Sequence, residues 1–358
     1  MTLLILAQVI GGFVLLVAGA ELLVRGASRI ASAMGVTPLV IGLTIVAYGT
    51  SAPEMAVSVG AALRGAADVS LGNVVGSNIF NTLLILGASA LVAPLSVHQK
   101  LIRIDIPLLI GVSCVSALMA WNGNVGRFEG TVLGLGAIAY TVFAILESRR
   151  ETRSIAEEYE QEFGARPEAQ GTLRNVLLIL AGLACLVGGS DLLVRGSIQI
   201  AKSLGVSQLV IGLTIVAGGT SLPELATSVV AALKGERDIA VGNIIGSNLF
   251  NLLAVLGFSS AFSSSGVGVA RAAIEFDIPV MIIASILCLP IVFNDGVISR
   301  IEGAFLLTSY ALYVVYLILR AMEHPALGRF SVVAMVAMIP IGLWVLVAPL
   351  LRQRRETQ

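Results

Sequence analysis

Charge is scarce in this chain. Of its 358 residues, only 12% are Asp, Glu, Lys or Arg, whereas 57% are hydrophobic and the mean hydropathy is +0.95. A soluble domain carries about 25% charged residues, so this composition excludes an ordinary soluble fold and predicts a polytopic membrane protein. The 22 basic and 22 acidic residues balance to zero net charge, so no basic surface indicates a nucleic-acid partner.

Cysteine is also rare. Cys114, Cys185 and Cys288 all fall inside apolar segments, with no metal-binding spacing and no disulfide framework. The sequence lacks an HExxH zinc motif and the Ser/Lys or paired-Asp arrangement of an intramembrane enzyme, so we expect no enzyme activity and no cofactor. Residues 1–23 lack a basic leader and a cleavage site, which predicts a retained first span rather than a signal peptide.

Long apolar segments are what the chain has in abundance. A membrane-spanning helix needs roughly 20 mostly apolar residues. On this rule we predict eleven spans, at residues 3–24, 37–63, 69–93, 103–121, 127–147, 174–194, 207–233, 239–262, 274–293, 301–319 and 330–351. The expected fold is therefore an all-α polytopic membrane protein.

Residues 42–81 occur twice. The first occurrence is GLTIVAYGTSAPEMAVSVGAALRGAADVSLGNVVGSNIFN, and 212–251 reads GLTIVAGGTSLPELATSVVAALKGERDIAVGNIIGSNLFN, at an offset of 170 residues. Between 36–87 and 206–257, 33 of 52 positions are identical, which indicates an internal duplication. The first five predicted spans and the next five form the two copies, and the eleventh has no counterpart.

The duplication sets the expected domains. They are a first repeat at 1–148, a linker at 149–173, a second repeat at 174–320, and an additional helix with a basic tail at 321–358. In this layout most of the 22 Lys and Arg residues lie on one side of the membrane, the side that is normally cytoplasmic. We expect the N-terminus outside, and the linker and the C-terminus inside. Because five is an odd number of spans, the second repeat is expected to be inverted, as in many transporters.

A proline interrupts the second span of each copy. Pro53 cannot donate a backbone hydrogen bond, so the carbonyl of Gly49 loses its helical partner. We expect a break that frees backbone carbonyls and the hydroxyls of Thr50 and Ser51, directly before Glu54. Irregular backbone at this depth must be buried in protein or line a cavity. The second copy repeats the pattern with Gly219, Thr220, Ser221, Pro223 and Glu224.

Polar residues mark one face of the third span. Asn73, Ser77 and Asn81 recur every four residues and so share a helical face. The second copy has Asn243, Ser247 and Asn251 at the same places. These asparagines and serines either line a site or, in the case of Asn73 and Asn243, tie helix ends. Inverted copies would bring both faces to the midplane beside the two glutamates.

The predicted site is made of hard oxygen, without imidazole or thiolate. Such ligands suit Ca²⁺, Na⁺ or Mg²⁺ rather than Zn²⁺. A single buried glutamate can be a structural hydrogen-bond partner, but Glu54 and Glu224 lie at mirrored positions behind broken helices, which favours a transport site. Two glutamates balance one divalent ion, two Na⁺ or two protons, as exchange requires.

At GTSAPE and GNVVGSNIFN the chain resembles the sodium/calcium exchanger family of the cation/Ca²⁺ antiporter superfamily. It looks like a prokaryotic-type member with both of the family's α-repeats. The resemblance implies ten core helices in two inverted five-helix repeats, and alternating access in which the first and sixth helices slide past the core. It also implies an antiporter that exchanges Ca²⁺ for Na⁺ across the lipid bilayer, and it implies no protein partner. The Lys/Arg bias and the absence of a transit peptide favour a prokaryotic inner membrane.

The resemblance assigns roles to single residues. Glu54 and Glu224 resemble the central Ca²⁺ ligands, and Thr50 and Thr220 would offer backbone carbonyls to Ca²⁺. The implied Na⁺ ligands are the side chains of Ser51, Ser221, Ser77 and Ser247 and the carbonyls of Ala47 and Ala217. Asn81 matches an amide that the family places at the centre of the site.

One position departs from the family pattern. The family often has Asp where this chain has Asn251, so the pocket here holds two carboxylates rather than three. The coupling ion therefore stays open between Na⁺ and a proton. The alternatives are a Ca²⁺/H⁺ antiporter of the same fold and, in a different class, a cation channel lined by Glu54 and Glu224.

Overall fold

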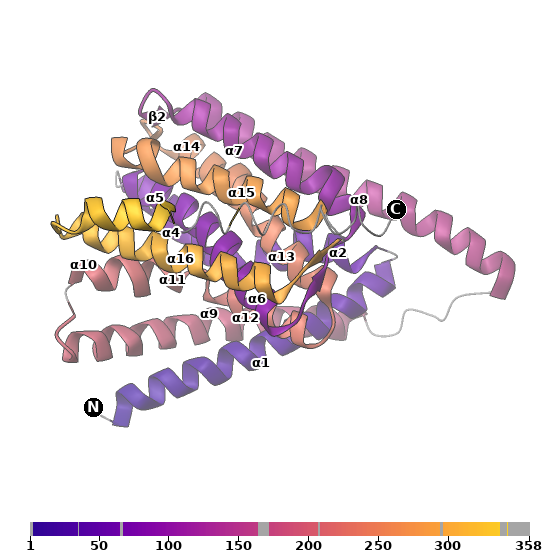
Figure 1. Cartoon of the computed structure of the whole chain (residues 1–358). Coiled ribbons are helices and arrows are strands. Elements are labelled where there is room, and N and C mark those ends of the chain that lie inside the picture. The colour runs from indigo at the N-terminus through magenta and orange to yellow at the C-terminus, as the bar shows by residue number, and fades with distance from the viewer. Residues whose placement is uncertain are drawn as a thin grey trace, which may run out of the picture.

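The computed structural model describes residues 3–34, 36–64, 67–163, 172–206, 208–293, 296–336 and 342. Within these residues the chain is almost entirely helical, which confirms the all-α class (Figure 1). Seven of the described helices are long and apolar enough to cross a membrane, and a bent pair, Pro38–Thr50 and Ala52–Leu63, makes an eighth.

The first copy contains five long helical segments, three of which consist of more than one element. They are α1 (Leu3–Met34); α2 (Pro38–Ile41), η1 (Gly42–Val46), α3 (Ala47–Thr50) and α4 (Ala52–Leu63); α5 (Ala67–Ile79), η2 (Phe80–Ile85) and α6 (Leu86–Val92); η3 (Leu101–Asp105) and α7 (Ile106–Ala120); and α8 (Arg127–Phe163). The η segments are π-helices. Helix α8 runs into the predicted linker as far as Phe163.

The second copy has the same order of elements. They are α9 (Thr172–Ser203); α10 (Gln208–Ile211), η4 (Gly212–Val216), α11 (Ala217–Gly219) and α12 (Leu222–Leu233); α13 (Arg237–Phe250), η5 (Asn251–Val255) and α14 (Leu256–Phe262); η6 (Ala273–Asp277) and α15 (Ile278–Phe293); and α16 (Arg300–Ala321). A short apolar helix, Leu327–Val336, follows. Most of the predicted eleventh span lies outside the described residues.

Two small antiparallel bridges join the copies. Strand β1 (Leu95–Ser96) pairs with β4 (Val297–Ile298), and β2 (Asn124–Val125) pairs with β3 (Val267–Gly268). β1 and β3 hold equivalent places in the two copies, and so do β2 and β4. Exchanging the copies therefore turns one bridge into the other, which supports a two-fold relation between them.

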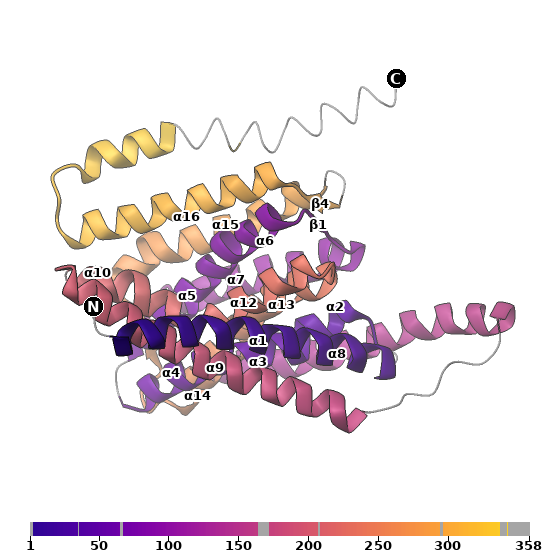
Figure 2. The ribbon, with the colours of Figure 1, turned by 90° about the horizontal axis from the view of Figure 1, so that it is seen from below.

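Helices α1 and α9 pack against one face of the bundle, at the lower edge of Figure 1 and toward the viewer in Figure 2. Their backbones are in direct contact. A Cβ atom added to Gly19 would lie 2.8 Å from the carbonyl oxygen of Gly182, and one added to Gly12 would lie 2.6 Å from the amide nitrogen of Leu193. Small residues allow such close approach between membrane helices.

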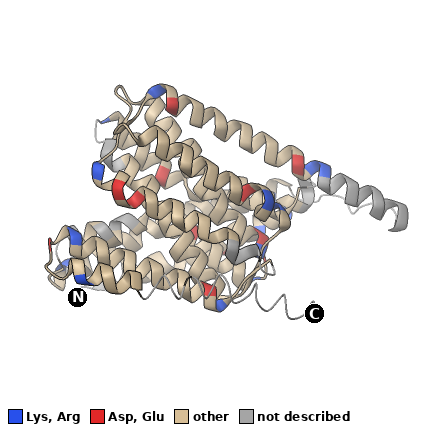
Figure 3. Ribbon diagram, turned by 45° about the horizontal axis from the view of Figure 1, so that its top comes forward, with Lys and Arg blue, Asp and Glu red and all other residues tan. Residues whose placement is uncertain are grey.

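The sequence Gly-Ser-Asn at 76–78 and 246–248 is called the GSN motif here. The two helices that carry it form the centre of the bundle. In the span Arg237–Phe262, 94% of the most apolar window is buried, and in Ser70–Val92 it is 78%, against at most 39% in the other unbroken spans. Charged residues lie mainly toward the ends of the bundle (Figure 3). The polar residues of the GSN motifs are thus held in the most enclosed part of the protein.

Candidate ion-binding site

Each broken helix changes direction at a serine. Ser51, between α3 and α4, has φ −84° and ψ 10°, and the two parts of this span are bent by 49°. Ser221, between α11 and α12, has φ −91° and ψ 9°. In both copies the proline falls in the first turn of the next helix, where its missing N–H costs that helix no hydrogen bond. The predicted break is confirmed in both copies.

A neighbouring helix caps one of the freed carbonyls. The carbonyl of Gly219, which Pro223 cannot satisfy, accepts a hydrogen bond of 2.6 Å from Ser190 Oγ on α9. Ala20 takes the place of Ser190 in the first copy, and its methyl group cannot donate. The two breaks are therefore stabilised differently.

Two buried glutamates lie at the breaks. Glu54 and Glu224 are both 0% exposed. Ser221 Oγ donates to Glu54 Oε1 at 2.8 Å, and Ser51 Oγ donates to Glu224 Oε1 at 2.6 Å. Each serine lies three residues before the glutamate of its own copy, so these two bonds cross and hold the glutamates close together. The Oε2 atom of each glutamate has no hydrogen-bond partner in the protein.

Two asparagines, Asn243 and Asn73, are hydrogen-bonded to residues at the breaks. Asn243 accepts from Thr50 Oγ1 at 3.1 Å, and its Nδ2 donates to the carbonyl of Glu224 at 3.4 Å and to Ser228 Oγ at 2.9 Å. The equivalent bonds in the other copy join Thr220 to Asn73 (3.3 Å), Asn73 to the Glu54 carbonyl (3.3 Å) and Asn73 to Ser58 (2.9 Å). The sequence left open whether Asn73 and Asn243 line the site or tie helix ends. These contacts favour the second role.

Further asparagines connect the two copies. Asn251 Nδ2 donates to Asn78 Oδ1 at 3.1 Å, Asn78 Nδ2 donates to the carbonyl of Asn248 at 3.3 Å, and Asn248 Nδ2 donates to Thr82 Oγ1 at 2.8 Å. Sequence reasoning did not include Asn78 and Asn248 in the site. The occurrence of GSN in both copies was the signal that could have identified them. Asn81 is also buried, and neither its oxygen nor its nitrogen has a partner.

The remaining predicted ligands are placed as follows. Ser77 Oγ lies 3.1 Å from Ser221 Oγ, whereas the buried Ser247 Oγ has no partner. The carbonyl of Ala47 already accepts from the amide of Ser51 at 3.0 Å and from Thr50 Oγ1 at 3.3 Å. The backbone of Ala217 belongs to α11, and its side chain lies outside the described part of the chain.

Several buried oxygen atoms of the glutamates, asparagines and serines described above have no partner in the protein. They are Oε2 of Glu54 and Glu224, Oδ1 of Asn81, Asn248 and Asn251, and Oγ of Ser247. Each buried polar group without a partner costs about 1–3 kcal/mol, so this group of acceptors points to a ligand that supplies positive charge. No group of three or more His, Cys, Asp or Glu side chains suited to a metal occurs among the described residues.

The two sides of the site differ in packing. Gly42 and Gly242 are buried together, and a Cβ atom on Gly242 would lie 2.8 Å from the carbonyl oxygen of Leu39. The equivalent residues of the other copy, Gly212 and Gly72, are both exposed. Asn243 is fully buried, whereas its counterpart Asn73 is partly exposed. The backbone is therefore closely packed on the side of η1 and α13, and more exposed on the side of η4 and α5.

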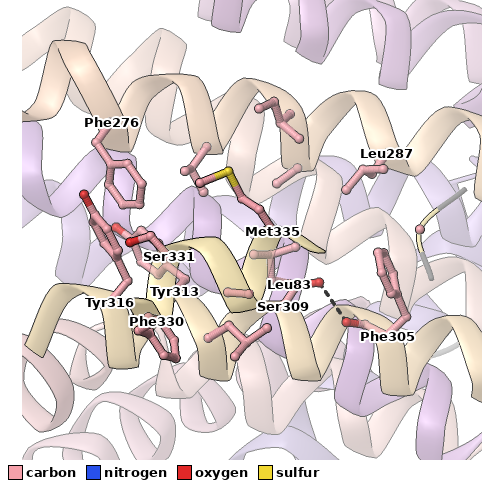
Figure 4. A pocket seen from close by; sticks show the side chains of 16 residues that line it. Leu83, Phe276, Leu287, Phe305, Ser309, Tyr313, Tyr316, Phe330, Ser331 and Met335 are labelled. Atoms are coloured by element: carbon pink, nitrogen blue, oxygen red, sulfur yellow. Dashed lines mark hydrogen bonds between the residues drawn. The ribbon is translucent and has the colours of Figure 1, made fainter. Parts of the chain in front are cut away.

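A cavity of about 540 Å³ lies elsewhere, between α15, α16 and the helix Leu327–Val336 (Figure 4). Apolar and aromatic side chains such as Phe276, Leu287 and Met335 dominate its lining, and Ser309 turns its hydroxyl to the carbonyl of Phe305. The lining contains no charged residue and none of the predicted ligands. This cavity therefore does not offer a cation site.

Two long segments, residues 4–146 and 174–319, match the family described as sodium/calcium exchanger protein. The chain belongs to this family. The exchanger is 41% identical over 310 residues to the putative antiporter CaxA of Alkalimonas amylolytica. The aligned region covers 85% of this chain and 96% of CaxA. It is 33% identical over 338 residues to the sodium/calcium exchanger MaX1 of Methanosarcina acetivorans, covering 86% and 96%.

A solved structure also resembles the exchanger. It is the sodium-calcium exchanger NCX_Mj soaked with Na⁺ and Sr²⁺, which is 30% identical, has a TM-score of 0.74, and covers 88% of this chain and 99% of that chain. The exchanger is thus an integral membrane protein of an antiporter family rather than an enzyme. The matched segments omit residues 147–173.

Proposed function

We propose that this exchanger moves Ca²⁺ across the membrane against Na⁺ by alternating access, with Ca²⁺ held between Glu54 and Glu224. The observation that carries the proposal is the pair of fully buried glutamates, one from each copy, joined by the crossing bonds of Ser51 and Ser221. The names of MaX1 and NCX_Mj as sodium/calcium exchangers support the choice of ions.

The ligand set suits Ca²⁺. Ca²⁺ takes 6–8 oxygen ligands in flexible geometry, and the Oε2 atoms of both glutamates are free of protein donors. Once Ca²⁺ leaves, two buried carboxylates without counter-ions would be costly, so cations must replace it. Na⁺ then binds the oxygens of the neighbouring serines and amides. The Ala47 carbonyl must give up one of its two hydrogen bonds to take part.

We place the protein in a prokaryotic inner membrane, with the N-terminus outside and the linker and C-terminus inside. The relative named inner membrane protein YrbG, from Escherichia coli, is 38% identical over 283 residues and supports this location. The exchange of the two β-bridges between copies supports inverted repeats. In this orientation the exposed Gly72 and Gly212 lie on the outer side of the membrane, so we place the access route to the enclosed site on that side.

Flux measurements in proteoliposomes test the proposal. Vesicles loaded with Na⁺ should take up ⁴⁵Ca²⁺ when diluted into Na⁺-free medium, and a pH gradient alone should drive no uptake. Uptake driven only by the pH gradient would replace Na⁺ with protons, which the two carboxylates could also hold. Ca²⁺ flux that follows its own gradient, with no counter-ion, would indicate a channel. The full burial of both glutamates favours an enclosed site over a pore.

A further inference from the structure

We propose that the cavity between α15, α16 and the helix Leu327–Val336 binds one acyl chain of a bilayer phospholipid, whose phosphate is held by Arg320. The bound lipid ties the additional helix to the second copy. The lining of the cavity, its length, a cation at one end and a contrast with the first copy point to this ligand. Because the cavity contains none of the predicted ion ligands, the inference is independent of the proposed function.

The lining of the cavity suits hydrocarbon. Its volume of about 540 Å³ falls within the range of about 300–1,000 Å³ that is common for small-molecule sites. Ser309 and Ser331 donate their hydroxyls to carbonyls of their own helices, both at 2.8 Å. Tyr313 donates to Asp277 at 2.9 Å. Because an apolar cavity does not retain water, the ligand that fits this space is an apolar chain from the surrounding membrane.

The cavity and the arginine beyond it match the length of one lipid. Figure 4 shows Phe276 and Tyr316 at one end of the cavity and Leu287 and Phe305 at the other. At about 1.5 Å per residue, the distance along α16 from Phe305 to Arg320 is about 22 Å. A bilayer is about 40–45 Å thick with its head groups, so one leaflet has the same length. A phospholipid with its phosphate at Arg320 therefore places the end of its chain near Phe305.

A cation lies at the aromatic end. Arg320 follows Tyr316 by one turn of α16, and its Cζ atom lies 6.0 Å from the centre of the Phe276 ring. None of the ion pairs among the described residues includes Arg320. Asp277, next to Phe276, accepts from Tyr313. Because the guanidinium group matches the geometry of a phosphate, Arg320 can hold the head group while the rings contact the start of the chain.

The first copy lacks both parts of this end. Counted from the starts of α8 and α16, which are equivalent, Glu147 stands at the place of Arg320. Counted in the same way in η3 and η6, Ile104 stands at the place of Phe276. A carboxylate repels a phosphate group. The cation and the aromatic end thus occur in the copy that the additional helix packs against, where Figure 2 shows this helix beside α16 at the edge of the bundle.

The test uses the purified full chain in detergent, after removal of lipid. Native mass spectrometry counts bound dioleoylphosphatidylglycerol. Dioleoylglycerol supplies the same chains without phosphate, and glycerol 3-phosphate supplies the phosphate without chains. We expect one phospholipid per chain, and binding at least about tenfold weaker for each partial molecule. Equal binding of dioleoylglycerol would overturn the role of Arg320, and equal binding of glycerol 3-phosphate would overturn the role of the cavity.

Two variants separate the head group from the chain. Arg320→Gln should lower the affinity for the phospholipid about tenfold, through loss of charge-assisted hydrogen bonds. Arg64→Gln, at an exposed arginine that ends α4, should leave the affinity unchanged. Ala334→Trp fills the cavity and should prevent binding, whereas Val332→Trp, at a 59% exposed position of the same helix, should not. Phospholipid should raise the unfolding temperature of the wild type but not of Ala334→Trp.

A phospholipid with a photoreactive acyl chain locates the ligand in the wild type. We expect labels on α15, α16 and the helix Leu327–Val336. Labels spread evenly over all lipid-facing helices would show ordinary contact with the bilayer and would overturn the inference. A dimer that Ala334→Trp dissociates would show that a second copy of the chain covers the cavity, which would also overturn it. The wild-type measurements decide the proposal even if a variant fails to fold.

Discussion

The two copies share most of their motif residues, yet they are packed differently. Gly242 lies against the backbone of Leu39, whereas Gly72, the same residue of the same motif, is exposed. Because the two sequences are nearly identical, local conformational preference cannot explain why their environments differ. It is expected if one side of the site must be closed while the other is open. In the proposed alternating access, the two copies would exchange these environments during transport.

Other differences are fixed by the sequence itself. Tyr48 packs on Phe250 with ring centroids 4.3 Å apart and its hydroxyl meets Thr141, whereas Gly218 stands in its place in the second copy. A Cβ atom on Gly218 would lie 2.9 Å from the ring of Phe80. Such contacts cannot be exchanged between the copies, so the two states of the proposed cycle would differ in free energy.

The glutamates should be equally essential, because they are equally buried. We expect Glu54→Gln and Glu224→Gln each to lower Na⁺-driven Ca²⁺ uptake by at least about 100-fold, since breaking a buried charge pairing costs about 3–5 kcal/mol. The partly exposed Glu21, which pairs with Lys234, is the control, and Glu21→Gln should change uptake less than about twofold. Normal uptake by either folded site variant would contradict the central assignment.

The crossing serines should be unequal. Hydrogen bonds to charged groups contribute about 1.5–3 kcal/mol, so Ser51→Ala should raise the half-saturating Ca²⁺ concentration about tenfold or more. Ser221→Ala should raise it further, because Ser221 also contacts Ser77 at 3.1 Å. Ser113 bonds only within its own helix, so Ser113→Ala serves as control. Equal effects at 51 and 221 would show that the Ser77 contact contributes nothing to binding.

The equivalent glycines should separate stability from turnover. Gly242→Ala forces a methyl group to 2.8 Å from Leu39 O and should destabilise by about 1–3 kcal/mol through overpacking. Gly72→Ala should unfold at no lower temperature than wild type, yet exchange more slowly, because the same contact must form there in the other state. Thermal unfolding in detergent and initial uptake rates measure the two effects. Equal destabilisation by both changes would mean that both sides are packed alike.

The smallest effect is expected at the capped carbonyl. Ser190→Ala removes the donor to Gly219 O and should lower the free energy of unfolding by about 1 kcal/mol. Ala20→Ser places a hydroxyl at the equivalent position beside the other break and should cause no such loss. Chemical unfolding of the two variants provides the comparison, and a neutral Ser190→Ala would show that the freed carbonyl needs no donor.

Much of the site could be predicted because its signals are local. Pro53 and Pro223 predicted the breaks. The spacing of Asn73, Ser77 and Asn81 predicted polar groups on one face of the third span. The π-helical segments were not predicted, because a hydrogen bond to the fifth residue leaves no mark in composition or hydropathy. They occur at equivalent places in both copies and include Asn81 and Asn251, as π-helices often do at functional sites.

Contacts between the copies were harder to predict. The crossing of Ser51 to Glu224 depends on how two distant segments meet, and a linear pattern does not contain that distance. The close packing at Gly242 and the exposure of Gly72 are harder still to predict, since the same motif is buried in one copy and exposed in the other. Residue types indicate which groups belong to the site, and packing determines which of them meet.

The two β-bridges bear on the origin of the chain. Each bridge consists of one strand from the first copy and one from the second, so neither copy could form a bridge alone. A half-length ancestor would have needed a second molecule of itself, inserted in the opposite orientation, to pair the same edges. Gene fusion would then have joined the two molecules in one chain, in which the copies now differ at Ser190 and Ala20 and at Tyr48 and Gly218.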